Sequence, residues 1–444
     1  MKSIRIIKQL QSICLVLLLT VVGSPILADP QDSDLSVEHY RQTPPTLFNQ
    51  KIHPELKKQD KPKKSDWLKR DQLTGNWGGT RDELAKKGML FEAVVTAEAF
   101  SRISGGDSSE DSTSGLANFD LTATFDTEKL GLWKGGTLFI YYETLIGDGN
   151  SINEAMDNPL VPISTLDADH FSQFSAWYYQ QMLLDGKLRL KGGKHDANSE
   201  FANSDSTGEF INGGISSPAN IPYPTFPDPG LGFVAEVTAT KWMSILAGIY
   251  GADLNGRSNS DGGLFDGDSI SLLEFDFSPA SAGNYAGNYK IGGWYTTLTT
   301  NEIVATSDPS TPGDYSDNYG LYLVVDQPIY VEKGNSSQGM NGFFEYSWAP
   351  NNRNQITNYI AFGVIYHGLL PNRGGDDIGL AVGISDISSN LSSDGLTEET
   401  AVELFYNYVA TPWLTFQPDF QWQINPGGEG PNAVAAGLRT TITF

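Results

Sequence analysis

The sequence predicts an all-β fold, a transmembrane antiparallel β-barrel of about sixteen strands with a short N-terminal helix. Three observations predict it: segments of about ten residues with alternating polar and apolar side chains, a secretion signal, and long loops that alternate with short turns. Glycine (47 residues) and aromatic residues (11%) are abundant, as in many all-β chains. A secreted β-sandwich is the alternative, because a single alternating strand does not tell a lipid-facing surface from a buried core.

The first 28 residues are typical of a secretory signal peptide. Three basic residues precede an apolar stretch, and we expect cleavage near Ala28. A membrane-anchoring helix is the alternative for this stretch. Cys14 is the single cysteine, so the mature protein would contain no thiol or disulfide. Cleavage removes three positive charges and changes the formal charge from -24 to -27 (-24 - 3), which argues against nucleic-acid binding because phosphates would be repelled.

Residues 29–70 are polar and lack periodicity, and we interpret them as a flexible periplasmic leader that precedes a barrel domain at residues 71–444. The domain opens with LTGNWGGTRDELAKKG, residues 73–88. Thr80 and Glu83 have capping-box spacing, and Gly88 suits the end of a helix. A short helix is therefore predicted over residues 80–87.

Sixteen strands are predicted after this helix. They lie at residues 90–101, 118–127, 136–146, 172–182, 187–195, 231–239, 241–250, 269–278, 288–298, 319–329, 340–348, 359–368, 377–386, 402–410, 413–424 and 434–444. The long connections are residues 102–117, 147–171, 196–230, 251–268, 299–318 and 387–401. Short turns at one rim and long loops at the other are typical of outer-membrane barrels.

Strict alternation assigns side chains to the two faces of each strand. In LTFQPDFQWQI, residues 414–424, Phe420 and Trp422 belong to the apolar face, and Leu438 and Ile442 do so in the last strand. The polar face is expected to line the pore, with candidates Glu98, Asp120, Arg189, Lys191, His195, Glu403, Gln417, Asp419, Gln421, Gln423 and Arg439. For each of these, a solvated wall position or a structural ion pair is the alternative.

Four segments resemble the carbohydrate-selective porins of the OprB family. They are LTGNWGGTR, GKLRLKGGKHDANSEFA (186–202), FINGGISSPANIPYPTFPDPGLG (210–232) and the C-terminal segment from residue 411 to 444. The resemblance covers about residues 71–444. It implies a sixteen-stranded barrel in the outer membrane of a Gram-negative bacterium. Such a barrel passes monosaccharides and related small polar solutes down their gradient.

The longest loop, residues 196–230, contains five carboxylates and no Lys or Arg. In porins the loop at this place folds into the barrel. Here its carboxylates would then face Arg189, Lys191 and Arg439. We expect these three cations to form one wall of the constriction and to donate hydrogen bonds to sugar hydroxyls. The alternative is an external lid. The loop's candidates for the constriction, including aromatic residues that stack on sugars or simply hold the loop folded, are Asp196, Glu200, Phe201, Glu209, Phe210 and Tyr223.

No enzymatic or cofactor motif is found. The five histidines lack metal-ligand spacing, and DGGLFDGD (261–268) lacks the spacing of a calcium loop. We expect no metal, cofactor or catalytic residue. Expected partners are permeating sugars, outer-membrane lipid and lipopolysaccharide, and the barrel-assembly machinery, reached through the strand ending at Phe444; a homo-oligomer is possible. A general diffusion porin, an adhesive barrel and a secreted polysaccharide-active enzyme are the functional alternatives.

Overall fold

The computed structural model describes residues 67–107, 109–110, 113–148, 150–253, 256–257, 264, 267–279, 285–305 and 311–444. The expected signal peptide, the cleavage near Ala28 and most of the leader lie outside the described residues, as does most of the acidic segment 261–268. Over the described ranges, no helix combines the length and apolar character needed to cross a bilayer.

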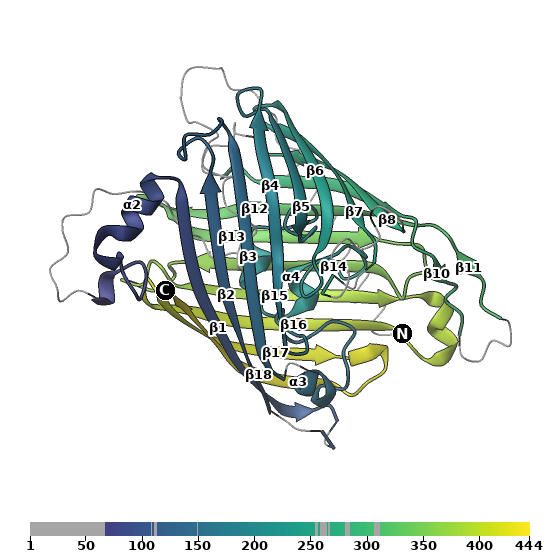
Figure 1. The fold of residues 1–444 in the computed structure, drawn as a ribbon. Coiled ribbons are helices and arrows are strands. Elements are labelled where there is room, and N and C mark those ends of the chain that lie inside the picture. Colours follow the sequence, from purple (N-terminus) through teal and green to yellow (C-terminus); the bar gives the residue numbers. More distant parts are fainter. Residues whose placement is uncertain are drawn as a thin grey trace. The chain divides into compact units, whose positions relative to one another are not determined.

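Within the described residues, sixteen strands close into one antiparallel barrel, which confirms the predicted fold (Figure 1). Each strand pairs with its neighbours in the chain, and the first pairs with the last. The strands are β1 (Met89–Gly105), β2 (Thr113–Asp126), β3 (Gly136–Asp148), β4 (Phe171–Leu183), β5 (Leu188–His195), β6 (Gly230–Thr240), β7 (Met243–Gly251), β8 (Ser269–Phe277), β9 (Asn288–Thr296), β12 (Asn318–Glu332), β13 (Asn335–Trp348), β14 (Ile356–His367), β15 (Asp377–Ile387), β16 (Glu398–Thr411), β17 (Leu414–Ile424) and β18 (Ala433–Thr443). A separate two-stranded sheet joins β10 (Thr300–Asn301) to β11 (Asp314–Tyr315).

Each of the sixteen predicted strands overlaps one strand of the barrel, but several are longer than predicted. β1 and β2 continue their ladder to the pair Ser101–Thr113, so their connection is shorter than the expected loop of residues 102–117. These strand ends, RISG (102–105) and TSGLA (113–117), consist mainly of Ser, Thr and Gly, with Ile103 exposed and Leu116 buried, so the alternation on which the prediction depended is weak there. Backbone pairing nevertheless continues there.

The helices are short. They are α2 (Thr80–Lys86), α3 (Asn150–Ala155) and α4 (Gly213–Ser216), with 3-10 turns η3 (Trp67–Lys69), η4 (Trp77–Gly79), η5 (Thr207–Glu209), η7 (Ser389–Asp394) and η8 (Pro426–Gly428). α2 begins at Thr80 as predicted, but the residue that caps it is Gly79, and no side chain makes the capping bond. Gly88 follows the helix with a φ of 86°, which favours glycine.

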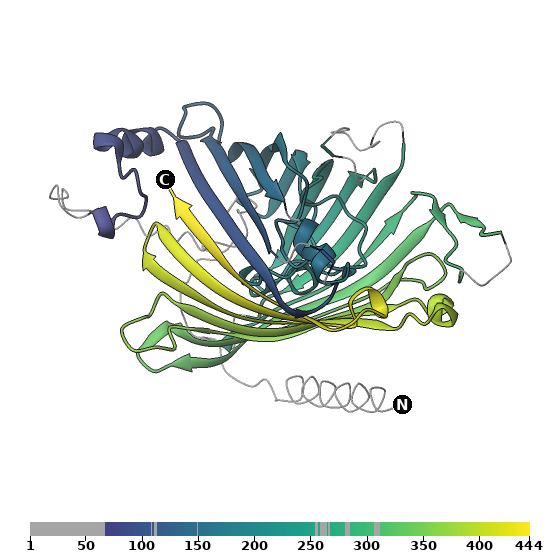
Figure 2. The ribbon, with the colours of Figure 1, turned by 90° about the horizontal axis from the view of Figure 1, so that it is seen from below.

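The helix α2 lies beside the end of the last barrel strand in both views (Figures 1 and 2). Arg81 Nη2 donates to the backbone oxygen of Phe444 at 3.0 Å. The Leu73 N–H donates to the Thr443 oxygen at 2.8 Å. The LTGNWGGTR segment therefore fastens the C-terminal end of β18 at the seam where the barrel closes.

The two faces of the strands follow the predicted alternation. Phe420, Trp422 and Leu438 are 47%, 42% and 43% exposed on the exterior, whereas Gln421 and Gln423 are fully buried on the inner face. A barrel that exposes large apolar side chains outward and buries polar ones inward is arranged for lipid outside and water inside. The alternation of residues 414–424 is therefore that of a membrane barrel.

Two long loops fold into the barrel interior (Figure 2). The β5–β6 loop, residues 196–229, includes α4, and the β3–β4 loop, residues 149–170, includes α3. Phe210 of the first loop packs against Phe405 of β16, with ring centroids 5.0 Å apart, and both side chains are buried. The alternative of an external lid for the β5–β6 loop is therefore wrong.

Candidate pore constriction

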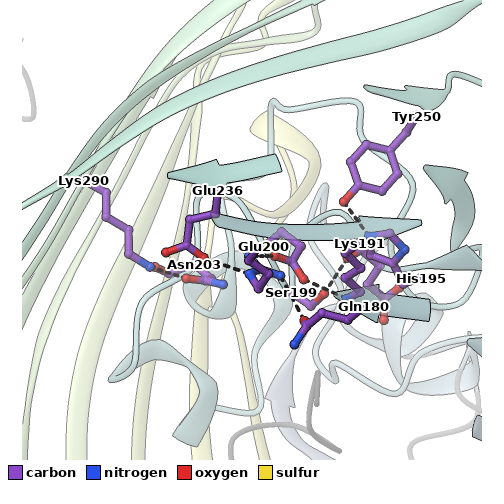
Figure 3. Close-up of polar contacts among 11 residues, drawn as sticks. Gln180, Lys191, His195, Ser199, Glu200, Asn203, Glu236, Tyr250 and Lys290 are labelled. Carbon is purple, nitrogen blue, oxygen red and sulfur yellow. Dashed lines mark hydrogen bonds and ion pairs between the residues drawn. The ribbon is translucent and has the colours of Figure 1, made fainter. Parts of the chain in front are cut away.

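The beginning of the β5–β6 loop is held by a buried ion-pair cluster on β5 and β6 (Figure 3). Arg189 Nη2 and Lys191 Nζ donate to the two oxygens of Glu200 at 2.6 and 2.7 Å. Arg189 Nε also donates to Glu236 at 2.8 Å. Because both cations are committed to carboxylates in a buried site, their main effect is to position the loop.

His195 belongs to the same cluster and is fully buried (Figure 3). Its Nε2 lies 2.9 Å from the Tyr250 hydroxyl, and its Nδ1 lies 3.0 Å from the Gly193 backbone oxygen. Its ring also lies edge-on against Tyr178. His195 is on the inner face of the barrel as predicted, but its ring is enclosed by these partners.

The charge of Glu200 is part of what holds the loop. Burial would raise its pKa, but the charges of Lys191 and Arg189 and the hydrogen bond from Arg189 outweigh burial and hold the pKa well below its ordinary value. A carboxylate with a depressed folded-state pKa contributes stability above its unfolded pKa and loses that contribution as the pH falls.

We therefore expect the β5–β6 loop to keep its protection from protease at neutral pH and to lose protection as the pH falls below about 4.5, the ordinary value for Glu. Glu200→Gln should show increased cleavage already at neutral pH, measured by limited proteolysis of the detergent-solubilised barrel. Equal protection of both proteins across this range would contradict a role for the charge.

The middle of the loop is held by carboxylates from the facing wall. Glu274 on β8 accepts from the Ala202 N–H at 2.9 Å, and Asp326 on β12 accepts from the Ser204 hydroxyl at 2.6 Å. These buried wall carboxylates satisfy polar groups of a loop that carries no cation of its own. Part of the barrel's acidic excess is therefore used to anchor the loop.

The tip of the loop reaches β16 and β17. The two oxygens of Glu403 accept from the N–H groups of Ile211 and Asn212 at 2.7 and 2.8 Å. The Asn212 side chain donates to Gln421 at 2.8 Å, and Gln417 donates to the Glu209 backbone oxygen at 2.8 Å. Three of the predicted lumen residues, Glu403, Gln417 and Gln421, therefore contact the tip of the loop directly.

The β3–β4 loop also narrows the lumen, which the sequence reasoning missed. Ser164 donates to Glu98 at 2.6 Å, and Gln421 Nε2 donates to the Ile163 oxygen at 2.9 Å. Leu160 and Val161 donate their N–H groups to Glu399 at 2.6 and 3.2 Å. The apolar run LVPI at residues 160–163 was the available signal, because a run of apolar side chains in a loop indicates that the loop is buried.

Arg439 lies apart from Arg189 and Lys191, which corrects the expectation that the three form one wall. β1, β2, β3 and β4 stand between β18 and β5 along the barrel. Arg439 pairs with Glu98 on the neighbouring strand β1, and its Nη2 donates to Thr165 at 2.9 Å. The sequence contained a signal for this pairing, since barrel closure sets Glu98 directly opposite Arg439.

Among the remaining loop candidates, three aromatic residues lie in apolar clusters, whereas Asp196 lies at the start of the loop. Phe201, Phe210 and Tyr223 are buried in apolar clusters that join the loop to the wall, so they hold it folded. Asp196 follows β5; burial raises its pKa to about 7, and repulsion by Glu143 adds to this.

The last two predicted wall residues, Asp419 and Gln423, are buried on the inner face of β17. Asp419 accepts from Gln421 Nε2 at 2.9 Å. The amide atoms of Gln423 have no hydrogen-bond partner among the described residues.

A polar cavity remains between the loops and the wall. Donors and acceptors from six strands and the β5–β6 loop line it, chiefly Asn118, Asp120, Tyr141, Glu209, Gln417 and Arg439. Arg439 and the Gln417 amide supply donors, and the carboxylates of Asp120 and Glu209 supply acceptors. A neutral solute rich in hydroxyls needs both kinds of partner.

Comparison with known proteins agrees with this architecture. The carbohydrate-selective porin, OprB family, matches residues 111–444. Porin B of Pseudomonas aeruginosa is 23% identical over 414 residues, which cover 84% of this chain and 91% of that protein. The putative porin QuiX of Acinetobacter baylyi is 23% identical over 421 residues, with 84% of this chain and 93% of that protein covered.

A solved structure shares the fold. The high-pH structure of Pseudomonas putida OprB superimposes with a TM-score of 0.77 at 22% identity, covering 85% of this chain and 99% of that one. The family match extends over most of the barrel, from β2 to the C-terminus. The chain therefore belongs to the OprB family of carbohydrate-selective porins, passive sugar channels of the Gram-negative outer membrane.

Proposed function

We propose that the protein is a passive channel for monosaccharides and similar small neutral polyols, and that the solute passes between the two inward loops and the inner face of β1–β3 and β16–β18. The observation that carries this proposal is the polar cavity that the loops leave beside Arg439, Asp120 and Gln417. Mixed donors and acceptors suit sugar hydroxyls, and a passage held narrow by fixed loops excludes larger solutes.

In this proposal Arg439 has one role, and Arg189 and Lys191 share another. Arg439 donates to sugar hydroxyls, while its pairing with Glu98 keeps its charge from attracting anions. Arg189 and Lys191 act on the solute through the position of the β5–β6 loop, because Glu200 occupies them. We propose a channel rather than an enzyme because the family and the closed barrel are those of a porin.

We expect glucose to block the ion current through a single channel in a planar bilayer, and we expect the double substitution Glu98→Gln with Arg439→Gln to weaken that block. The two amides can retain a hydrogen bond across β1 and β18, so the barrel should assemble. A double variant that folds and shows the same glucose block as the original would remove Arg439 from the passage.

We propose further that the chain is secreted by a signal peptide cleaved near Ala28 and that the C-terminal strand ending at Phe444 engages the barrel-assembly machinery. Support for the second point is the placement of Phe444 at the closing seam, where its N–H donates to Ala93 at 2.8 Å. Exposed acidic loops would lie beside lipopolysaccharide through bridging divalent cations.

A further inference from the structure

Two buried carboxylates in the barrel wall share one hydroxyl group. The Tyr141 hydroxyl lies 2.6 Å from Asp120 Oδ1 and 2.8 Å from Glu143 Oε2, and the two acidic residues are 2% and 1% exposed. A hydroxyl has one hydrogen, so it donates to one carboxylate at a time. The other carboxylate then faces an oxygen lone pair, and the unit lacks a positive group.

The other partners of this unit are neutral. Asn118 Nδ2 donates to Asp120 at 2.7 Å, and Ser175 and Gln173 donate to Glu143. Among the described residues, no Lys or Arg forms an ion pair with either carboxylate. Lys194 acts on Glu143 from a distance, since its Nζ donates to Gln173, whose amide donates to Glu143. Buried carboxylates without a directly bonded cation are costly, which makes the site receptive to one.

Asn118, which belongs to the same unit, carries an acceptor that is unpaired in the described part of the chain. Asn118 is 2% exposed, and its Oδ1 has no hydrogen-bond partner among the described residues. Asn118, Asp120 and Tyr141 line the polar cavity together. A buried acceptor without a donor, in a residue that lines the cavity, is an attachment point for a hydrogen-bond donor on the solute.

The charge of the whole inner wall has the same sign. Among the described strand residues, eleven buried carboxylates stand against four buried Lys and Arg side chains. The acidic ones are Glu98, Asp120, Glu143, Glu236, Glu274, Asp276, Asp326, Glu345, Glu399, Glu403 and Asp419, and the basic ones are Lys191, Lys194, Lys290 and Arg439. Carboxylate-rich pores favour cations over anions.

We propose that Asn118, Asp120, Tyr141 and Glu143 form a binding site for an ammonium group, so that the channel admits amino sugars and prefers cations to anions. An ammonium group supplies three hydrogen-bond donors and one positive charge. The donors would satisfy the unpaired Asn118 oxygen and the carboxylate to which the Tyr141 hydroxyl does not donate, and the charge would offset that of the two carboxylates. The hydroxyls of the same solute would then face Arg439 and Gln417 across the cavity. This inference rests on the proposed sugar channel and adds the charge of the preferred solute.

Two readouts test the site. The reversal potential of the protein in a bilayer with a KCl gradient should indicate cation preference, and liposome swelling should be faster in glucosamine hydrochloride than in sodium glucuronate. Asp120→Asn with Glu143→Gln should lower the K⁺-to-Cl⁻ permeability ratio several-fold and lower the ratio of glucosamine to glucose swelling. Asp276→Asn, which neutralises a carboxylate on β8, is the matched control and should change both ratios much less.

Gel migration before and after boiling shows which variants are folded. If the double variant does not assemble, Asp120→Asn alone should produce a smaller shift in the same direction. Anion preference in the original protein, or equal ratios in the original and a folded variant, would overturn the ammonium site. Absence of glucose swelling would instead refute the proposed sugar channel, whereas the reversal potential still tests the site.

Discussion

Leu438→Arg is expected to prevent most of the protein from assembling as a folded barrel. Leu438 lies on the exterior of β18, the strand that closes the barrel against β1. An arginine on the lipid-facing surface at the bilayer midplane costs about 2–4 kcal/mol. β18 must pair with both β1 and β17 for the barrel to close, so this cost falls on the closing step. The measurement is the folded fraction in outer-membrane extracts, taken as the fraction of the protein whose gel migration changes on boiling.

Thr415→Arg is the matched control for this prediction. Thr415 lies on the neighbouring strand β17, but it lines the interior cavity, where water can solvate a charge. Gln421 is unsuitable as an inward control, because it is fully buried and bonded to Asn212, Ile163 and Asp419. Equal loss of folded protein for Leu438→Arg and Thr415→Arg would show that the exterior face does not meet lipid.

Glu403→Ala is expected to detach the tip of the β5–β6 loop and widen the channel. The substitution leaves the buried N–H groups of Ile211 and Asn212 without acceptors, and each unmade hydrogen bond costs about 1–3 kcal/mol. The tip is also closely fitted, since a Cβ added to Gly383 would lie 2.1 Å from the Gly214 oxygen. We expect a higher single-channel conductance and new protease cleavage near residues 208–216.

Glu332→Ala controls for loss of a carboxylate elsewhere in the barrel. Glu332 is at the end of β12 and accepts from the Tyr366 hydroxyl at 3.0 Å, with no role in anchoring the loop. The single-channel conductance of the Glu332→Ala protein should match that of the original protein. Unchanged conductance and protease resistance in folded Glu403→Ala would mean that the apolar contacts alone hold the loop tip.

The strands could be predicted because their signal is local. In residues 414–424 the alternation alone places Trp422 outside and Gln421 inside, and the structure agrees. The strand ends were less predictable because backbone pairing continues where the side-chain pattern stops, as between Ser101 and Thr113. The cap of α2 was misplaced because glycine at residue 79 adopts a positive φ that suits the turn into the helix.

The contacts inside the barrel were less predictable because they depend on where long loops travel. Glu403 and Ile211 are separated by 192 residues, and no local pattern relates them. Alternation placed Glu403 on the inner face, yet only the path of the loop makes it an anchor. The same holds for Phe201 and Phe210, whose rings meet the wall and not the passage.

Two of the ion pairs were within reach of the sequence. Arg189 stands directly opposite Glu236 on β6, and Arg439 stands directly opposite Glu98 on β1. Opposite charges on directly facing residues of antiparallel strands are expected to pair. Predicting the second pair requires only that the first and last strands meet, which a closed barrel demands.

Liposome swelling tests the central claim most directly, that this barrel passes small sugars through a passage narrowed by its own loops. Purified protein in liposomes would be mixed with isotonic solutions of a monosaccharide, a disaccharide, larger oligosaccharides and neutral amino acids. The account predicts rapid swelling in glucose, slower swelling in the disaccharide and little in larger oligosaccharides. Protein that conducts ions but produces no swelling in glucose, or swells equally in sugars of every size, would contradict it.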